Sequence, residues 1–187
     1  MKARVVKTFS LDGESVIFRY PQFSDWSDML KKVNSLVKEK AFISTQRRET
    51  AKKSRQWIRQ ILKSVEEKRS VTLMVEIRGH VVGGGSIWMA KDEDGVGFLG
   101  ISIRSIMPDT HEKLWGRGIG KKLIYTLMHE AKIVLGTKVV KLGAFLINHN
   151  AVALYRKCGF KETHRVRREK IHYGVMRDRI YMKRRLR

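Results

Sequence analysis

Hydrophobic and polar residues alternate at the start of the chain. Two alternating runs, residues 4–9 and 15–20, lie on either side of Leu11-Asp12-Gly13. Alternation is typical of a strand with one buried face, and Asp-Gly between two such runs is a strong hairpin signal. The pattern therefore predicts that the chain opens with two antiparallel strands.

The next hydrophobic residues recur at helical spacing. One such stretch runs from Ser24, which can act as an N-cap, to about Lys40, and a second covers residues 48–67. Both are expected to be helices. The exposed side of the second helix is basic and could contact nucleic acid, although such a face is more often simply solvated.

Strand patterns return in the middle of the chain. Residues 71–78 and 81–89 predict a second hairpin, and residues 98–103 predict a strand that ends between Ile103 and Met107. Three consecutive glycines, 83–85, interrupt the second of these strands. Glycines inside a strand indicate a bulge or the close approach of another part of the protein.

The stretch 114–124 combines closely spaced glycines with the start of a helical pattern. Gly116, Gly118 and Gly120 have no Cβ atoms, so backbone N–H groups can turn toward one anion. The N-terminus of the following helix adds partial positive charge, and Lys121 and Lys122 add formal charge. The stretch predicts a phosphate-binding loop, with an ordinary solvated turn as the alternative.

The helix behind this loop is expected to end near Leu135, with Gly136 as its stop signal, and a strand follows at 138–147. A strand, a loop, a helix and a further strand in this order form a crossover unit, so strands 98–103 and 138–147 should be parallel. Three elements complete the chain, namely a short helix over 151–158 and strands over about 160–170 and 174–184.

Composition limits the class of protein. A chain of 187 residues suits a single domain, 1–187, and no hydrophobic run approaches the roughly 18 residues of a membrane span. The start of the chain does not resemble a signal peptide, and Cys158, the only cysteine, agrees with a reducing compartment. We therefore expect a soluble cytoplasmic protein with no membrane partner. Neither cysteine nor histidine spacing suggests a metal site.

The charge is strongly positive. Forty Lys and Arg residues against 18 Asp and Glu give a net charge of +22. The C-terminal residues 160–187 are dense in charge, with 11 basic and 3 acidic residues. Such a field attracts nucleic acid, anionic lipid or a polyanionic cofactor, and the alternative is that it serves only solubility.

Two motifs together resemble the GNAT family of acetyl-CoA-dependent N-acetyltransferases. Residues 116–120 match the glycine-rich cofactor motif of that family, with Trp115 where the family has Gln or Arg. The second pattern, Asn-x-x-Ala-x-x-Leu-Tyr-x-Lys-x-Gly-Phe, is reproduced from Asn148 to Phe160. The pair Asp178 and Met182 also resembles the closing strand of the family, so the resemblance covers nearly the whole chain.

The resemblance implies an α/β (α+β) fold: a mixed, mostly antiparallel sheet of about seven strands flanked by four helices, with a splayed parallel pair at the cofactor site. It also implies that acetyl-CoA is the co-substrate and that its pantetheine arm pairs with the strand before the glycine loop, at 101–103 or a register a few residues later. The residues that the resemblance assigns to the cofactor are Ile101, Ser102, Ile103, Trp115, Gly116, Arg117, Gly118, Ile119, Gly120, Lys121, Asn148 and Tyr155.

The chain departs from the family pattern in two places. Trp115 cannot supply the usual polar side chain, so the loop should bind the pyrophosphate through backbone N–H groups, the helix terminus and lysines. The link from Ile103 to Trp115 is also longer than is usual in the family.

Tyr155 matches the family residue that protonates the leaving thiolate, and Asn148 the one that contacts the pantetheine or orients the chain. Without the motif, Tyr155 would be read as a core aromatic and Asn148 as an N-cap. No motif marks a general base, for which the carboxylates placed near the acceptor are Glu39, Glu49, Glu76 and Glu112. Cys158 fits a small packed residue better than a nucleophile.

The leading hypothesis is an N-acetyltransferase that acts on a protein N-terminus, a lysine side chain or a small amine. The rival is a nucleic-acid-binding protein that kept the fold and lost the chemistry. A combination also stays open, in which the acceptor belongs to a nucleic-acid-associated protein or is an RNA-linked group. The net charge disfavours polyamine acceptors, and the oligomeric state, a homodimer included, is left open.

Overall fold

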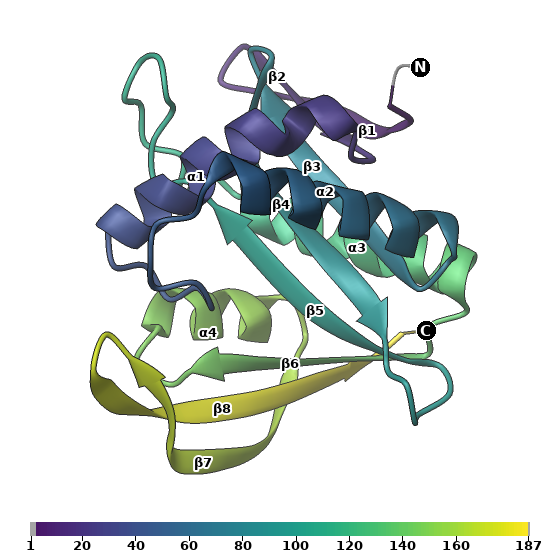
Figure 1. Cartoon of the computed structure of the whole chain (residues 1–187). Helices are drawn as coiled ribbons and strands as arrows, with labels where there is room; N and C mark the ends of the chain where they lie inside the picture. The colour runs from purple at the N-terminus through teal and green to yellow at the C-terminus, as the bar shows by residue number, and fades with distance from the viewer. Residues whose placement is uncertain (1–2, 187) are drawn as a thin grey trace.

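All strands of the computed structural model, which describes residues 3–186, belong to one sheet (Figure 1). Its eight strands lie in the order β1-β2-β3-β4-β5-β6-β8-β7. Their bounds are β1 Val5–Leu11, β2 Glu14–Arg19, β3 Ser70–Ile77, β4 His80–Met89, β5 Val96–Ile103, β6 Val139–Phe145, β7 Lys161–His172 and β8 Val175–Arg185. The sheet thus has one strand more than the expected number of about seven.

Every pair of neighbouring strands is antiparallel except β5 and β6, which are parallel. The helix between them is α3 (Ile119–Leu135), and it ends at Gly136 in the left-handed conformation, as the sequence predicts. The expected crossover unit is therefore confirmed.

Helices cover both faces of the sheet (Figure 1). On β4, a Cβ at Gly84 would lie 3.2 Å from the sulfur of Met74, which packs with the helices α1 (Trp26–Lys38) and α2 (Ala51–Glu66). A Cβ at the next residue, Gly85, would lie 2.8 Å from Leu127 of α3. Because successive strand residues point to opposite faces, α1 and α2 lie on one face and α3 on the other. The short helix α4 (His149–Lys157) contacts α3.

The glycines of β4 have the two roles that the sequence suggests. A register shift, or bulge, between Val75 and Glu76 of β3 lies opposite the start of this glycine run. A Cβ at Gly85 would also lie 2.6 Å from the side chain of Ile101, a distance too short for two carbon atoms that are not bonded. The glycines therefore let β5 and α3 pack tightly on β4.

The start of α1 differs from the prediction. A 3-10 turn, Phe23–Asp25, precedes the helix, so the N-cap residue is Asp25 and the assignment of Ser24 was wrong. Asp25 is held in place because its carboxylate accepts hydrogen bonds from the backbone N–H of Gln22 at 2.9 Å and from the buried guanidinium of Arg19 at 2.8 and 2.9 Å. The second helix also begins later than expected, after the cap residue Thr50.

The hydrophobic core has two parts, one on each side of the sheet. The larger part joins the sheet to α3 and α4, and the smaller part joins it to α1 and α2. Within residues 3–186, no helix is long and apolar enough to cross a membrane.

Candidate active site

The two parallel strands separate soon after they meet. β5 and β6 pair only at Val96–Phe98 with Val139–Lys141, whereas β5 stays paired with β4 as far as Ile103 and β6 stays paired with β8 as far as Phe145. The facing edges of β5 and β6 beyond that point therefore carry backbone groups without a strand partner, and the sheet has a gap at its centre.

The register of β5 decides which backbone groups face this gap. The N–H of Arg104 donates to Val82 of β4 at 2.9 Å, and in an antiparallel pair every second residue bonds to the same neighbour. Ser102 therefore bonds to β4, whereas Ile101 and Ile103 turn their N–H and C=O groups toward the gap. The carbonyl of Ile103 agrees with this assignment, because it accepts a hydrogen bond from the indole of Trp115 at 3.0 Å.

The glycine loop lies at the start of α3. Gly118 is the N-cap with φ of 80°, and the first helical hydrogen bond, from Lys122 N–H to Gly118 C=O, measures 3.1 Å. The N–H groups of residues 119–121 consequently have no acceptor within the helix. A side chain at Gly118 would be strained by the positive φ and would stand in the open space where an anion could approach. The loop is thus shaped to bind an anion through its backbone.

The side chains of two predicted cofactor residues are already engaged. Arg117 pairs with Asp12 of the β1–β2 turn at 2.7 Å, and the Trp115 indole holds the carbonyl of Ile103. These residues therefore offer backbone groups rather than side chains to a ligand. Lys121 supplies an exposed cation beside the loop.

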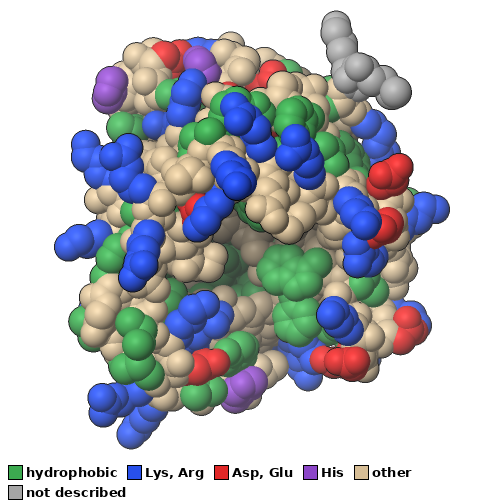
Figure 2. All heavy atoms as spheres, viewed as in Figure 1, with side chains coloured by type: hydrophobic (Ala, Val, Ile, Leu, Met, Phe, Trp, Pro, Cys, Tyr) green, Lys and Arg blue, Asp and Glu red, His purple; other side chains and the backbone are tan. Residues whose placement is uncertain are grey.

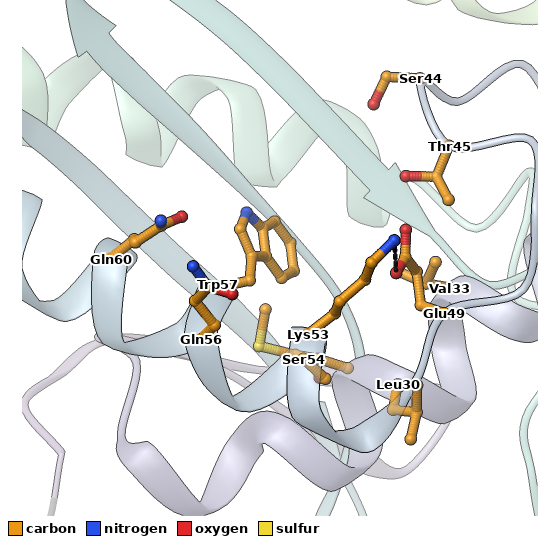
Figure 3. Close-up of a pocket in the computed structure, with 11 residues that line it drawn as sticks. Leu30, Val33, Ser44, Thr45, Glu49, Lys53, Ser54, Gln56, Trp57 and Gln60 are labelled. Carbon is orange, nitrogen blue, oxygen red and sulfur yellow. Dashed lines mark ion pairs between the residues drawn. The ribbon is translucent and has the colours of Figure 1, made fainter.

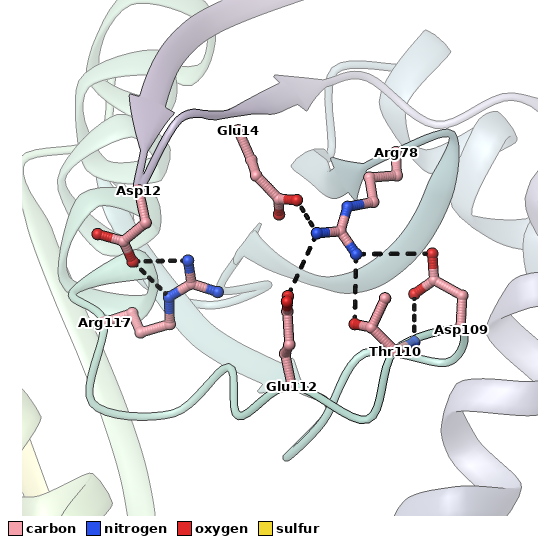
Figure 4. A network of polar contacts seen from close by, with 7 residues as sticks. All are labelled: Asp12, Glu14, Arg78, Asp109, Thr110, Glu112 and Arg117. Atoms are coloured by element: carbon pink, nitrogen blue, oxygen red, sulfur yellow. Dashed lines mark hydrogen bonds and ion pairs between the residues drawn. The ribbon is translucent and has the colours of Figure 1, made fainter.

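The long link between β5 and the glycine loop is a closed excursion that returns to the end of β5. Ile106 bridges to Lys113, and the N–H of Leu114 donates to Ser105 at 2.8 Å. Figure 4 shows how the guanidinium of Arg78 anchors this excursion from the β3–β4 turn. Its partners are Glu14, Asp109, Thr110 and Glu112. The extra residues therefore return the chain to the end of β5 before the glycine loop begins.

Tyr155 lies on α4 among the core residues that α4 shares with α3. Its side chain is buried, with the ring 6.0 Å from that of Phe160 in an edge-to-face arrangement. Burial raises the pKa of Tyr155 to about 12, with a smaller contribution from Cys158. The hydroxyl consequently keeps its proton at neutral pH and is a weaker acid than that of an exposed tyrosine.

Asn148 caps the same helix. Its side-chain oxygen accepts a hydrogen bond from the N–H of Ala151 at 3.3 Å. This contact is the N-cap role that the residue would have without any family motif.

The side of the sheet covered by α1 and α2 is hollowed. Figure 2 shows the hollow below these helices and above β6 and β8, with Lys and Arg side chains around it. A cavity of about 400 Å³ lies on this side between α1, α2 and the segment that joins them (Figure 3). Its lining includes Trp57, Thr45 and the ion pair of Glu49 with Lys53, 3.6 Å apart. This side of the sheet therefore has room for a ligand.

The β7–β8 hairpin holds the α1–α2 segment from below. Gln46 donates to the carbonyl of Ile171 at 2.8 Å and accepts from the N–H of Tyr173 at 2.7 Å. The ring of His172 stacks on Phe42 with the centroids 4.7 Å apart. These contacts join two walls of the hollow.

Two of the four candidate carboxylates are held by arginines. Glu76 accepts from the guanidinium of Arg19 at 2.6 Å, and Glu112 belongs to the Arg78 network. Of the other two, Glu39 accepts from Ser105 at 2.7 Å, and Glu49, which lines the cavity, pairs with Lys53. Among residues 3–186, no group of three His, Cys, Asp or Glu side chains could hold a metal ion.

One residue of the site is not among those predicted from the sequence. Lys32 of α1 is 3% exposed, and its Nζ donates to the Ser102 hydroxyl at 3.0 Å. Burial lowers the pKa of Lys32 to about 8. The signal was present in the sequence, because Lys32 falls three residues after Met29 and four before Leu36, within the hydrophobic stripe of the helix.

The sequence model of the Acetyltransferase (GNAT) family matches residues 34–160. This match covers more than half of the chain, so the protein belongs to the GNAT acetyltransferases, which are acyl-CoA-dependent enzymes. The family assignment made from the two motifs is thereby confirmed. No curated protein matches the chain by sequence.

Solved structures share the fold. RimL, a ribosomal L7/L12 alpha-N-protein acetyltransferase in complex with coenzyme A, superimposes with a TM-score of 0.82 at 11% identity over 98% of each chain. The ribosomal-protein-alanine N-acetyltransferase from Brucella melitensis gives 0.76 at 23% identity, over 90% of this chain and 99% of that one. The microcin C7 self-immunity acetyltransferase MccE, in complex with acetyl-CoA and AMP, gives 0.76 at 15% identity, over 91% and 92%.

Proposed function

We propose that this protein transfers the acetyl group of acetyl-CoA to a primary amine, by direct attack within a ternary complex. The observation that best supports the proposal is the gap between β5 and β6, which opens after Phe98 and Lys141. An extended pantetheine arm could lie in the gap as an added strand and pair with the backbone of Ile101 and Ile103.

The glycine loop would hold the pyrophosphate. Its free N–H groups at 119–121, the positive end of α3 and the charge of Lys121 suit a doubly anionic group. Bound there, acetyl-CoA supplies an activated acetyl group and a good leaving group. In this proposal Trp115 and Arg117 contribute through the backbone, and Asn148 acts by fixing the start of α4 beside the gap.

The residues around the gap suit the chemistry of acyl transfer. A backbone N–H of Ile101 or Ile103 would stabilise the oxygen that gains negative charge as the amine attacks. Tyr155 would donate its proton to the departing sulfur. The thiol of Cys158 is fully buried and burial raises its pKa, so this residue is not suited to form a covalent acetyl-enzyme.

The acceptor in this proposal is a protein N-terminus, a lysine side chain or a small amine that enters from the hollow. Two of the solved structures with the same fold are named as acetyltransferases of ribosomal proteins, which favours a peptide acceptor as the first to be tested. An open hollow flanked by a wide cavity also leaves room for an extended peptide.

Contact with nucleic acid is a second candidate function. It rests on β7, an edge strand in which Arg167, Arg168 and Lys170 are exposed. An extended ribbon with cations along it can follow a phosphate backbone. Such a contact is compatible with acetyl transfer, because it would bring the enzyme to acceptors that are bound to nucleic acid.

Calorimetry with acetyl-CoA and a thiol-release assay test the proposed function. The assay would use peptides with free N-termini, a peptide with an acetylated N-terminus and an internal lysine, and small amines including a polyamine. We expect acetyl-CoA binding in the micromolar range and turnover with at least one peptide amine. Binding of acetyl-CoA without turnover of any amine, together with tight binding of nucleic acid, would favour the rival hypothesis of a nucleic-acid-binding protein that lacks catalytic activity.

A further inference from the structure

Lys32 stands apart from the other buried charged side chains of residues 3–186. Buried Arg19, Asp25 and Glu130 each have an oppositely charged partner, whereas Lys32 donates to the neutral hydroxyl of Ser102. Burial of an ammonium ion without a counter-charge is costly, so this position makes the neutral amine more accessible than it is in an exposed lysine.

Within residues 3–186, no acidic group of the surrounding elements pairs with Lys32. On α1, Asp28 accepts from the N–H of Val81 at 2.9 Å and pairs with Lys31, and Glu39 binds Ser35 and Ser105. Lys53 of α2 and Glu49, which precedes that helix, pair with each other. Arg104 follows the end of β5 and has the same positive charge as Lys32. The only titratable residue of β4 is His80, at the start of that strand. Desolvation alone lowers the pKa of Lys32 to about 8, so about one-tenth of the molecules carry the neutral amine at pH 7.

Ser102 connects this amine to the site of chemistry. Its side chain is half-buried and lies on the face of the sheet that carries the hollow, the same face that α1 and Lys32 cover. Its neighbours on either side, Ile101 and Ile103, turn their N–H groups into the gap. A hydroxyl at this position can accept a proton on its open side while it donates its own proton to Lys32.

We propose that Ser102 and Lys32 form the proton relay that deprotonates the acceptor ammonium, with Ser102 touching the acceptor and Lys32 receiving the proton. This inference rests on the proposed function and assigns the base for which the sequence offered only carboxylates. Two of those carboxylates, Glu76 and Glu112, are held in ion pairs with Arg19 and Arg78.

Protons and bonds balance in this relay. The ammonium gives one proton to the Ser102 oxygen as the hydroxyl proton of Ser102 passes to the Lys32 nitrogen, which becomes an ammonium. The free amine then forms the new C–N bond, the C–S bond breaks, and the sulfur takes a proton from Tyr155. The second proton of the attacking nitrogen restores Tyr155, and Lys32 returns its proton to solvent by the reverse transfer through the Ser102 hydroxyl after the product leaves.

The titration of Lys32 can be measured without acetyl-CoA or an acceptor. Carbon-13 NMR of the full chain, labelled in its lysine side chains, would follow each lysine with pH, and Lys32→Met would assign the signal. We expect the Lys32 signal to titrate near pH 8 and the exposed lysines near their usual value. Titration of Lys32 at the usual value would overturn the proposal.

The second measurement is the pH profile of kcat/KM with the peptide amine that turns over fastest. Lys32→Met and Lys32→Arg should both lower the rate about 100-fold at pH 8 and remove the limb near pH 8, because neither side chain exchanges a proton there. Ser102→Ala should lower the rate similarly, and its combination with Lys32→Met should add little further loss. Lys31→Met, on the exposed side of the same helix, is the matched control and should keep the wild-type profile.

The outcomes separate the relay from the proposed function. Wild-type rates in Lys32→Met would show a structural role, and wild-type rates in Lys32→Arg would show that only positive charge is needed. Either result would overturn the relay and leave the acetyltransferase proposal intact. An enzyme that binds acetyl-CoA and acetylates no amine would overturn both.

Discussion

Burial of Lys32 gives the protein a stability that depends on pH in a specific direction. The pKa of this side chain is about 8 in the folded protein against a reference value of 10.5. Between these values the unfolded chain binds more protons than the folded one, so the free energy of unfolding rises with pH.

We expect Lys32→Met to remove this pH dependence, because methionine has no titratable group. Methionine also suits the surrounding hydrophobic residues, so the variant should fold. The stability advantage of the variant over the wild type should shrink by about 3 kcal/mol between pH 7 and pH 10.5. Urea unfolding at a series of pH values would measure the difference. A constant difference would show that Lys32 is solvated in the folded state, and Lys31→Met should differ little from the wild type at any pH.

Tyr155→Phe tests the proton donor. Phenylalanine keeps the packing against Phe160 and removes only the hydroxyl, so the protein should fold and bind acetyl-CoA as before. Because a thiolate leaves readily, its pKa being about 8.5 by analogy with cysteine, the loss in kcat should be modest, about 10- to 100-fold. Steady-state kinetics and calorimetry would separate the two effects. Tyr125→Phe, on the exposed side of α3, is the control, and equal kcat values for the two variants would argue against the role of Tyr155.

Gly118→Leu tests the anion-binding loop. Both Gly118 and Gly136, at opposite ends of α3, have positive φ angles and open space where a Cβ would stand, so leucine should strain the two sites similarly, by about 1–2 kcal/mol. Only Gly118→Leu should weaken acetyl-CoA binding, by at least about 10-fold in calorimetry. Similar affinities in the two variants would remove the loop from the cofactor site.

At the level of single residues, the glycine loop and α4 could be predicted from the sequence because each carries a family motif. Lys32 was missed because a lysine in a hydrophobic stripe has no motif and its partner is 70 residues away. The sequence could not show that Trp115 and Arg117 are held by Ile103 and Asp12, because those contacts depend on how the turns meet.

Among the elements, the gap between β5 and β6 is framed by parts that come from distant segments. The α1–α2 segment and the tip of the β7–β8 hairpin are tied together by Gln46, whose amide makes two hydrogen bonds to the hairpin backbone. The wall of the hollow therefore depends on a contact between residues more than a hundred positions apart.

Gln46→Ala should loosen this wall. Loss of two hydrogen bonds, each contributing about 1 kcal/mol, should raise amide hydrogen exchange in residues 39–50 by about 10-fold or more. The affinity for acetyl-CoA should stay the same, while KM for a peptide acceptor should rise. Gln60→Ala, at the other side of the cavity, serves as the control. Unchanged exchange in Gln46→Ala would show that stacking of His172 on Phe42 holds the segment without it.

Most strands and helices were predictable because their hydrophobic periodicity is strong, whereas β7 has only Val166 and Ile171 among polar residues. The errors lie at ends where side chains from elsewhere decide. The carboxylate of Asp25 is held by Arg19 and by the backbone N–H of Gln22, so a 3-10 turn precedes α1, and β6 stops at Phe145, before the expected residue 147, where the chain turns toward α4. The splay of β5 and β6 has no local signal of its own, and only the family resemblance indicated it.

For the whole molecule, the net charge of +22 sets how it meets its partners. Charge of this size accelerates the approach of polyanions and is screened by salt. Because the whole protein attracts polyanions, a nucleic-acid contact at one surface has to be distinguished from this general attraction by changing the charges of that surface alone.

The double variant Arg167→Glu and Lys170→Glu places acidic residues on β7. If β7 contacts nucleic acid, binding to single-stranded RNA should weaken and the slope of log affinity against log salt should fall by about 1 or more. Fluorescence anisotropy at several salt concentrations would measure both. The same two charge reversals at Lys7 and Lys68, on other parts of the surface, are the control, and an equal effect there would reveal non-specific attraction.

The position of β7 at the end of the sheet has a consequence for handling the protein. A 12-residue edge strand offers a row of unpaired backbone groups to any other strand, including the β7 of a second molecule. Mutual repulsion of its cations keeps two such edges apart. Concentrated salt removes that repulsion, so colloidal stability should be lowest in the high-salt buffers commonly chosen to strip nucleic acid from basic proteins.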